Sequence, residues 1–412
     1  MKRTLGLFYY ITILYGIAAI SIDPLIPIIS RELSIGYDRI GLILLTGYVF
    51  SLISSLITGI LCDKVNLKKV TLAGLAILFM GFLIFGFKIS VIIFIISLIL
   101  QKSGYSSIDS SMHSFVAKVY HNMHAPIFIK IDIMFYIGAI ISPLLISFLL
   151  FFNISYRYAF FLFAAVITIL AFLLFLNLKK IDINKIIMKN QNSSETEEGS
   201  GIYVKKEKLN AIIILSCLAM FFSMGTLSGV SSWFTTYLST FNITVAYGSI
   251  GLSMMWAVCF LSLIGFLKIF KKTNEITLLL SGGVLGVIFM SVAALSTNII
   301  IKLVFLLLHA GCYSCFFSML TSIATYEAHK SKGSILGLII TCAFSGSIIF
   351  QPLLGYFAQY LGSGSIIYVL IAGYLISLVF LILLFYFLKK KHKRMRIMLR
   401  LIKHEAKIRA GL

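Results

Sequence analysis

Acidic residues are scarce in this sequence. Only 14 of its 412 residues are Asp or Glu, and charged residues of both signs make up 12% of the chain. A soluble domain usually has about 25% charged residues, because it must present a polar surface to water. Here hydrophobic residues make up 60% of the chain, and the mean hydropathy is +1.03. The shortage of charge excludes an ordinary water-soluble domain and predicts that lipid surrounds most of the protein.

Motifs for several kinds of chemistry are also missing. The sequence has no glycine-rich P-loop to hold ATP phosphates, so we do not expect an ATP-driven pump. Cys312 and Cys315 form a C-x-x-C pair, but no further Cys or His follows at metal-ligand spacing, and we interpret the pair as helix packing. We recognise no nucleophile with a neighbouring base. The sequence therefore predicts no metal, no cofactor and no enzyme activity.

What the chain does have is a series of hydrophobic runs. A helix that crosses a bilayer needs about 20 mostly apolar residues, because its backbone polar groups must bond within the segment. We predict an all-α polytopic membrane protein with twelve spans at 5–30, 39–61, 70–87, 90–117, 126–150, 156–178, 209–237, 248–269, 275–295, 299–325, 332–358 and 364–388. The first run is too long for a cleavable signal peptide, so we expect it to be retained as a helix.

The pattern breaks once, at a polar stretch. Residues 179–208 contain several Asn and Ser residues and the acidic run Glu195 to Glu198, which is typical of a solvated linker. The chain thus divides into an N-terminal six-helix half at 1–178, a linker at 179–208, a C-terminal six-helix half at 209–388 and a basic tail at 389–412. Two halves of six helices are the repeat arrangement of one large class of transporters.

The basic residues indicate the orientation in the membrane. With these spans, 29 of the 35 Lys and Arg residues fall on one side. The positive-inside rule makes that side cytoplasmic, so we expect a multi-pass protein of the cell membrane with both termini in the cytoplasm. This uneven distribution argues against a nucleic-acid partner and for membrane lipids. The tail is either a basic amphipathic helix on anionic headgroups or a plain topology anchor.

A loop motif carries a family resemblance. The segment after the second span reads Gly-Ile-Leu-Cys-Asp-Lys-Val-Asn-Leu-Lys-Lys from position 59, and it resembles the signature G-x-x-x-D-[RK]-x-G-x-[RK]-[RK] of the major facilitator superfamily. Asn66 replaces the second glycine, and Asn also tolerates a positive φ angle. The resemblance implies a transporter whose halves rock about a site near the midplane, and we expect a monomer. The matching residues, which we predict to form a conformational gate, are Gly59, Asp63, Lys64, Lys68 and Lys69.

Two further stretches are similar to the sugar-symporter branch that includes fucose permease. One runs from Gly104 to His113 and contains Asp109, and the other runs from Ile137 to Pro143. Leu227 stands where this branch often has a glutamate. The resemblance implies proton-coupled symport of a small, sugar-like polar solute. A proton-driven exporter of drugs or metabolites remains an alternative, and a non-transporting membrane receptor is a third.

Charged residues inside the spans are the main candidates for function. A charge at bilayer depth costs at least about 2.5 to 3.5 kcal/mol on insertion scales, so it persists where it is paired or used. By the resemblance, Asp23 and Asp109 are candidates for proton coupling. We hypothesise that Asp109 exchanges the proton, while Asp23 and Lys102 bind solute or form an ion pair with each other. The alternative is that these charges only hold helices together. Asp132 is interpreted as a solvated charge at the cytoplasmic edge.

Polar residues within the spans complete the predicted solute site. Gln101 and Gln351 lie on spans that line the cavity in similar proteins. His309 lies in the middle of the tenth span and is either a solute or proton contact or a satisfied helix-contact histidine. Trp256 and Asn242 are also polar candidates for solute binding, but they do not lie on spans that line the cavity in similar proteins. The predicted solute-binding residues are Asp23, Gln101, Lys102, Asp109, His309 and Gln351.

Overall fold

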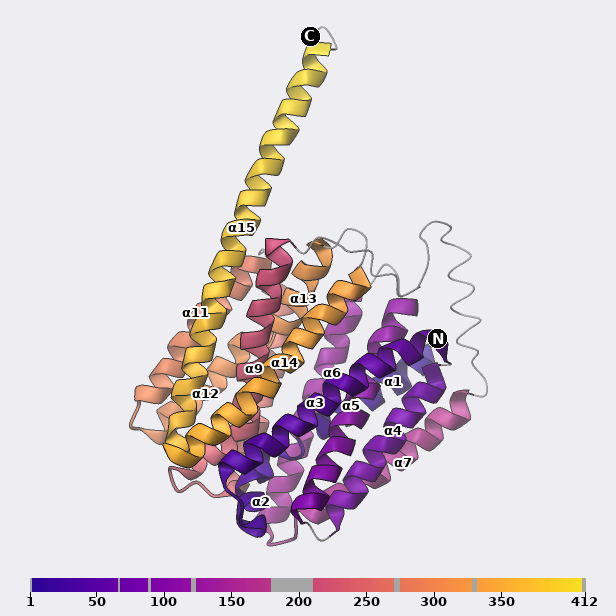
Figure 1. The fold of residues 1–412 in the computed structure, drawn as a ribbon, viewed down its shortest axis with the longest axis vertical. Helices are drawn as coiled ribbons and strands as arrows, with labels where there is room; N and C mark the ends of the chain where they lie inside the picture. The colour runs from indigo at the N-terminus through magenta and orange to yellow at the C-terminus, as the bar shows by residue number, and fades with distance from the viewer. Residues whose placement is uncertain are drawn as a thin grey trace.

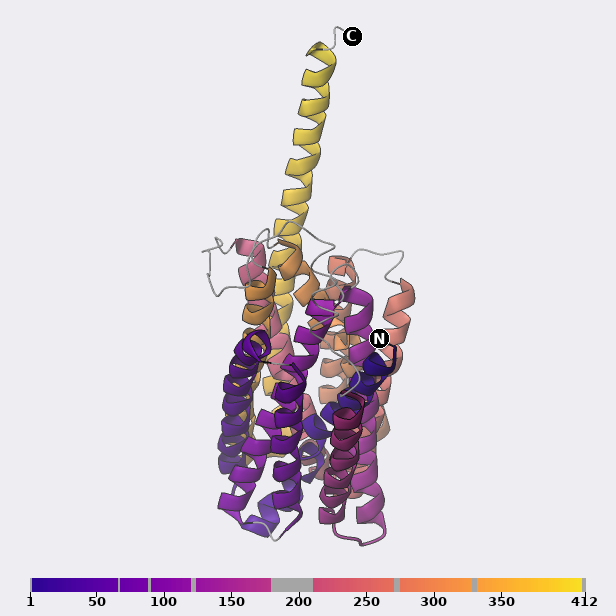
Figure 2. The same ribbon diagram turned by 90° about the vertical axis from the view of Figure 1, so that its right-hand side faces the viewer.

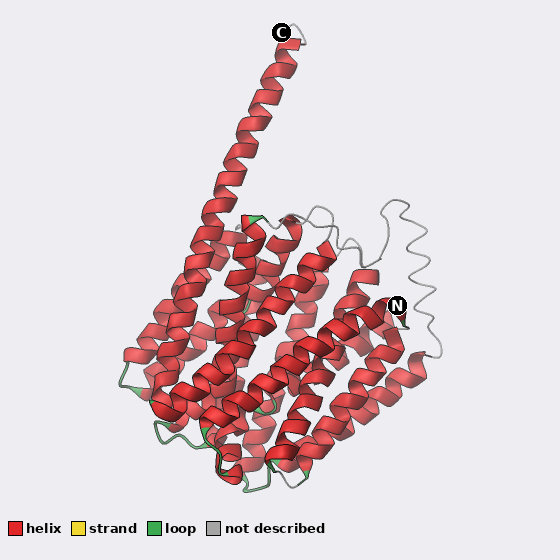
Figure 3. Cartoon of the chain, viewed as in Figure 1, coloured by secondary structure: helices red, strands yellow, loops and turns green. Residues whose placement is uncertain are grey.

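The computed structural model describes residues 2–65, 67–87, 90–119, 124–178, 210–269, 275–327 and 332–409. Within these ranges every regular element is a helix, and Figure 3 shows helices joined by short loops. Twelve helical segments are long and apolar enough to cross a membrane. The predicted fold class is therefore confirmed. The predicted linker at 179–208 lies outside the described residues.

The helices form two groups that stand side by side (Figure 1). The N-terminal group, from indigo to magenta, contains α1 (Lys2–Ile20), η1 (Asp23–Leu25), α2 (Ile26–Leu33), α3 (Tyr37–Lys64), α4 (Leu67–Gly86), α5 (Val91–Val119), α6 (His124–Phe151) and α7 (Arg157–Leu178). The C-terminal group contains α9 (Ala211–Ser239), α10 (Val245–Ile269), α11 (Glu275–Leu295), α12 (Ile299–Tyr313), α13 (Phe316–Glu327), α14 (Lys332–Tyr360), η2 (Ser363–Ser365) and α15 (Ile366–Arg409). We call these groups the N half and the C half.

Glycines at equivalent places show that the halves are packed alike. A Cβ atom added at Gly16 of α1 would meet the backbone of α6, and one added at Gly346 of α14 would meet the backbone of α9. Gly138 and Gly225 are the partners on the facing helices. Gly225 follows Gly16, and Gly346 follows Gly138, by about 208 residues in each case, as expected for a repeated unit. Only glycine permits so close an approach of two helix backbones.

The two ends of the bundle differ. The loops that join α2 to α3, α6 to α7, α9 to α10, α11 to α12 and α14 to α15 lie at one end, which we call the outer end. The C-terminal extension and both borders of the linker lie toward the opposite, inner end, at the top of Figures 1 and 2. The inner end carries most of the basic residues.

The last helix continues beyond the membrane span. The twelfth span covers Ser363–Lys391, and α15 extends without a break to Arg409, away from the bundle (Figure 2). No Gly or Pro follows Gly373 within α15, so nothing in the sequence ends the helix. The tail thus continues the line of the twelfth span. At its base, the Lys391 ammonium lies 2.7 Å from the carboxylate of the buried Glu327.

Two of the spans are broken helices. The first span consists of α1, η1 and α2, and the tenth consists of α12 and α13, which are separated at Ser314 and Cys315. In the tenth span, the Ser314 carbonyl accepts a hydrogen bond from the Tyr136 hydroxyl of the N half at 2.8 Å. Breaks inside membrane helices are tolerated where the freed backbone groups find partners in the protein.

Candidate functional site

Two prolines explain the break in the first span. Pro24 and Pro27 have no N–H group, so the carbonyls of Ile20 and Asp23 lack their usual helical donors. A side chain of the C half replaces one of the missing donors, because the Thr235 hydroxyl donates to the Asp23 carbonyl oxygen at 3.4 Å. The break places Asp23 at the boundary between the two halves.

The Asp23 carboxylate is bonded to the opposite half. Asp23 is buried, with 3% of its surface exposed. Ser231 donates to one carboxylate oxygen at 2.5 Å, and Ser232 donates to the other at 3.2 Å. Both serines lie on α9. The carboxylate therefore links the two halves toward the outer end of the cavity.

Lys102 does not form the ion pair with Asp23 that we considered. Its ammonium donates to the Ala19 carbonyl at 3.1 Å and lies 4.7 Å from the centre of the Tyr48 ring. No ion pair joins Lys102 to Asp23 in this conformation of the described chain. The physical reason is the broken first span, since α1 ends at Ile20 and its last carbonyls attract a cation.

Asp109 is paired with a histidine on its own helix. The Asp109 carboxylate lies 3.1 Å from Nδ1 of His113, one turn further along α5. The same nitrogen lies 2.9 Å from the Asp109 carbonyl oxygen. Both side chains are more than four-fifths buried and line the central cavity. A carboxylate beside an imidazole can pass a proton between two groups within hydrogen-bond reach.

The interpretation of Asp132 as a solvated edge charge is wrong. Asp132 is only partly exposed, lines the cavity, and accepts a hydrogen bond of 2.5 Å from Ser318 of α13. The reason is geometric. α6 already begins at His124, so Asp132 lies two turns inside the helix, on the face that meets the C half.

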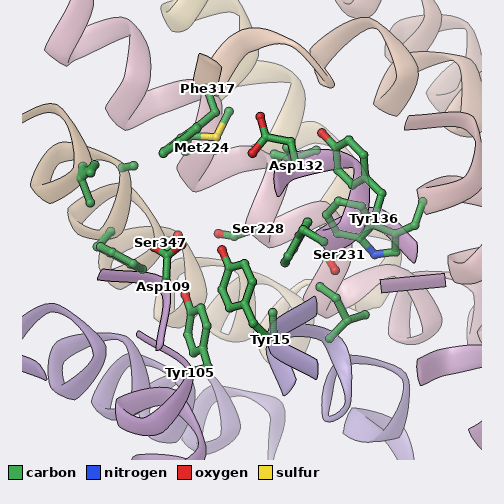
Figure 4. A pocket seen from close by; sticks show the side chains of 18 of the residues that line it. Tyr15, Tyr105, Asp109, Asp132, Tyr136, Met224, Ser228, Ser231, Phe317 and Ser347 are labelled. Atoms are coloured by element: carbon green, nitrogen blue, oxygen red, sulfur yellow. The ribbon is translucent and has the colours of Figure 1, made fainter. Parts of the chain in front are cut away.

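These residues surround one central cavity of about 210 Å³ between the halves. Figure 4 shows Tyr15, Tyr105 and Asp109 of the N half around the same space as Met224, Ser228 and Phe317 of the C half. The Tyr15 and Tyr105 rings are stacked, with their centres 5.3 Å apart. Other residues on the wall are Asp23, Tyr48, Lys102, His113, Asp132, Phe135, Tyr136, Ser231, Trp256, Tyr313, Phe344 and Ser347.

Three of the predicted solute-binding residues lie on this wall, namely Asp23, Lys102 and Asp109, and three do not. Gln101 is buried against α4 and donates to Ser97 at 3.0 Å. Gln351 accepts a hydrogen bond from the Trp233 indole at 2.9 Å behind the cavity wall. His309 is fully buried, with Nδ1 2.8 Å from the Gly286 carbonyl oxygen. In this conformation these three side chains meet protein neighbours instead of the cavity.

Part of the wall was not predicted from the sequence. Trp256 lines the cavity and packs against the rings of Phe135 and Tyr136, at centre distances of 5.7 Å. The tyrosines of the wall gave no sequence signal, because 20 tyrosines are spread over the chain. Their common feature is that they lie on α3, α5, α6 and the helices of the broken spans, which only the three-dimensional arrangement brings together.

The predicted gate residues lie at the inner end of α3 and the start of α4. Lys64 and Lys69 are exposed, Lys68 is half-buried, and the Asp63 side chain lies outside the described residues. A Cβ atom added at Gly59 would meet no atom within 4 Å. In this conformation the helix face that carries Gly59 therefore has no close packing partner at that level.

The outer ends of α3 and α14 are in close contact, in contrast to their inner ends. A Cβ atom at Gly41 would lie 2.7 Å from the Gln351 carbonyl oxygen and 3.2 Å from Cα of Gly355. The Tyr37 backbone N–H also donates to the Gln359 side chain at 2.8 Å. At the inner end of α14, a Cβ atom at Gly337 would meet nothing within 4 Å. Along these two helices the closest backbone approach lies at the outer end, and the two glycine positions near the inner end have no close neighbour.

Comparisons with known proteins agree with this architecture. A family model described as Major Facilitator Superfamily matches residues 8–350. A bacterial homolog of the human lysosomal transporter Spinster, solved in an inward-facing and occupied conformation, superposes with a TM-score of 0.70 at 14% identity, over 93% of this chain and 96% of that chain. A D-xylose–proton symporter superposes with a TM-score of 0.74 at 10% identity, over 92% and 96%. At such identities the likeness concerns the fold. No curated protein matches the sequence.

Proposed function

The chain belongs to the Major Facilitator Superfamily, and we propose that it is a proton-coupled secondary transporter that moves a small solute across the cytoplasmic membrane by alternating access. One observation carries the proposal. A cavity between the two halves is walled by three aspartates, while the backbones of α3 and α14 meet closely at the outer end and their glycine faces near the inner end, at Gly59 and Gly337, meet no neighbour. Such a site is open to one side of the membrane at a time.

The positive-inside rule supports the direction of the opening. The inner end carries most of the Lys and Arg residues, so we assign it to the cytoplasm together with both termini. In the present conformation the cavity then faces the cytoplasm. A solute enters or leaves there, and the halves must rock to open the outer end and close the inner one.

Asp109 is our candidate for the group that exchanges the proton. It lies on the cavity wall and is paired with His113 at 3.1 Å, so a proton has two neighbouring acceptors. Cavity water in contact with bulk solvent can deliver the proton when the cavity is open. Closure separates the pair from bulk water and holds the proton until the other side opens. Asp132, across from Ser318, is another acid on the same wall.

A small polar solute such as a sugar is our first candidate. The wall offers serine and tyrosine hydroxyls and carboxylates, which can bond to sugar hydroxyls, and the stacked Tyr15 and Tyr105 rings offer a flat surface for a sugar ring. The D-xylose–proton symporter among the similar structures is in keeping with this class. The cavity volume of about 210 Å³ suits a compact molecule.

Proton-driven export of an organic cation is the second candidate. Three aspartates face the cavity, whereas Lys102 is engaged with Ala19 and His113 with Asp109. Aromatic rings and acids together are the groups that bind positively charged amphipathic molecules. The two candidates differ in the sign of the proton movement, since a symporter moves solute and proton together and an exporter exchanges them.

Proton movement in proteoliposomes tests the proposal. Sugars and organic cations are added in turn to the wild type, to Asp109→Asn and to Glu32→Gln, a carboxylate control outside the cavity. We expect one solute class to move protons in the wild type and in the control, and Asp109→Asn to reduce this movement at least about tenfold while solute binding persists. Proton movement by no solute would reject proton coupling. Normal proton movement by Asp109→Asn would reject Asp109 as the exchanging group.

A further inference from the structure

Asp23 faces two environments. Asp23 lines the outer part of the cavity, and both of its carboxylate oxygens accept hydrogen bonds from α9 of the other half. The backbone carbonyl of Asp23 accepts a third bond from the same helix, through Thr235. A single residue of the N half is thus attached to one face of α9 at three points.

These bonds belong to a larger contact between the halves. Gln351 of α14 donates to the Ser232 hydroxyl at 3.2 Å and accepts from the Trp233 indole at 2.9 Å. The Trp233 ring packs edge-on against Tyr37 of α3, with the ring centres 5.9 Å apart. The Asp23 contact therefore continues into the packing of α3 on α14, where the halves are closed.

We propose that Asp23 is an outer latch, a negatively charged group that holds the halves together at the outer end until a proton or a cationic group of the solute neutralises it from the cavity. The proposal rests on the proposed alternating access. It assigns to Asp23 a positioning role that is separate from the proton exchange proposed for Asp109. Solute or proton arrival would then release the outer end from inside the cavity.

The charge matters because of the hydrogen bonds that it accepts. A hydroxyl bonds to a carboxylate about twice as strongly as to a neutral acceptor. Neutralising Asp23 therefore weakens the bonds from Ser231 and Ser232 without removing any atom from the contact. The groups that face Asp23 electrostatically are Lys102 of α5 and Tyr48 of α3, and the Lys102 ammonium is bonded to the Ala19 carbonyl.

Distances between spin labels on the two halves test the latch. Labels at Tyr158→Cys and Leu295→Cys report on the outer end, because both native residues are more than half exposed there. Labels at Leu176→Cys and Tyr326→Cys report on the inner end. The six native cysteines are replaced first. The variants to compare are Asp23→Asn, the pair Ser231→Ala with Ser232→Ala, and the control Ser216→Ala.

Ser216 is a matched control because it is a fully buried serine of α9 that bonds only within its own helix, to the Ile212 carbonyl at 2.8 Å. We expect Asp23→Asn and the double serine variant each to raise the ratio of outer-open to outer-closed molecules about tenfold, and Ser216→Ala to leave it unchanged. Gel filtration and thermal unfolding show whether each variant is folded.

The outcomes separate the latch from the transport cycle. If the wild type opens outward on adding solute but Asp23→Asn keeps the wild-type ratio, the latch is rejected and alternating access stands. If only the double serine variant shifts the ratio, the charge of Asp23 is not what holds the contact, and the latch is likewise rejected. If the wild type never opens outward, with any solute or at any pH, the proposed function itself fails.

Discussion

The substitution Gly41→Ala tests how the outer end is held closed. The new Cβ atom would lie 2.7 Å from the Gln351 carbonyl oxygen and 3.0 Å from Cα of Pro352. Both are backbone atoms of α14, so no flexible side chain can move aside. The helices must separate locally, which disfavours the conformation in which the outer end is closed.

Gly59→Ala is the matched control on the same helix. Gly59 follows Gly41 by 18 residues, which is about five helical turns and places both glycines on one face of α3. Gly337 and Gly355 have the same spacing on α14. In this conformation a Cβ atom at Gly59 meets nothing within 4 Å. We therefore expect Gly59→Ala to spare this conformation and to hinder one in which the inner ends of α3 and α14 meet.

The size of the effect follows from the contact. Overpacking a close contact costs about 1 to 3 kcal/mol. Alanine also gains up to about 1 kcal/mol over glycine in helix propensity, but this gain is the same in both conformations and cancels in their ratio. Gly41→Ala should thus raise the ratio of outer-open to outer-closed molecules by a factor between about 5 and about 150.

The spin-label pairs described above measure this ratio at the outer and the inner end. Gly41→Ala is expected to lengthen the outer distance, and Gly59→Ala is expected to leave it short. Equal distance distributions for Gly41→Ala and the wild type would refute the view that this helix crossing keeps the outer end closed. A shift of equal size with Gly59→Ala would refute the assignment of the two glycines to opposite ends of the cycle.

Three further substitutions test the charges outside the proton step. Lys391→Ala removes the cation from the buried Glu327 carboxylate, which keeps only the 3.4 Å bond from Asn210, and should cost about 1 to 3 kcal/mol in thermal unfolding, most of which Glu327→Gln in the same chain should restore. Lys102→Met removes the donor to the Ala19 carbonyl and should lower the free energy of unfolding by about 2 kcal/mol. An unchanged free energy of unfolding would show that this hydrogen bond does not stabilise the break in the first span. Glu32→Gln weakens a half-exposed contact with Tyr156 and Arg157 and should change unfolding by less than about 1 kcal/mol.

Much of the fold could be predicted because lipid imposes simple rules. A helix must be long and apolar enough to cross the bilayer, so the hydrophobic runs alone located the twelve spans. The breaks in the first and tenth spans were less visible. Pro24 and Pro27 indicated a bend in the first span, but no proline marks the break at Ser314. There the Ser314 carbonyl accepts a hydrogen bond from Tyr136 of the other half, which the sequence does not show.

The site was predictable only in part. The cost of a charge in lipid drew attention to Asp23, Lys102 and Asp109, and all three lie on the cavity wall. Sequence alone could not show which face of a helix meets the cavity. Gln351 is therefore found behind the wall, and Trp256 on it. In a helix a shift of one residue turns the side chain by about 100°, so depth in the membrane does not fix exposure to the solute.

The two contacts between the halves differ in a way that bears on the rocking motion. Along α6, hydrogen bonds to the C half run from Asp132 near the inner end, through Tyr136 and the Ile140 carbonyl, to Ser147 near the outer end. Along α3 and α14, the tight contact is confined to the outer end. The side of the bundle at α6 is thus hydrogen-bonded over its whole length, whereas the closest contacts on the side at α3 lie toward the outer end. Because a rigid half can turn most easily about the side that stays bonded, we infer that the inner opening of this conformation lies between α3 and α14.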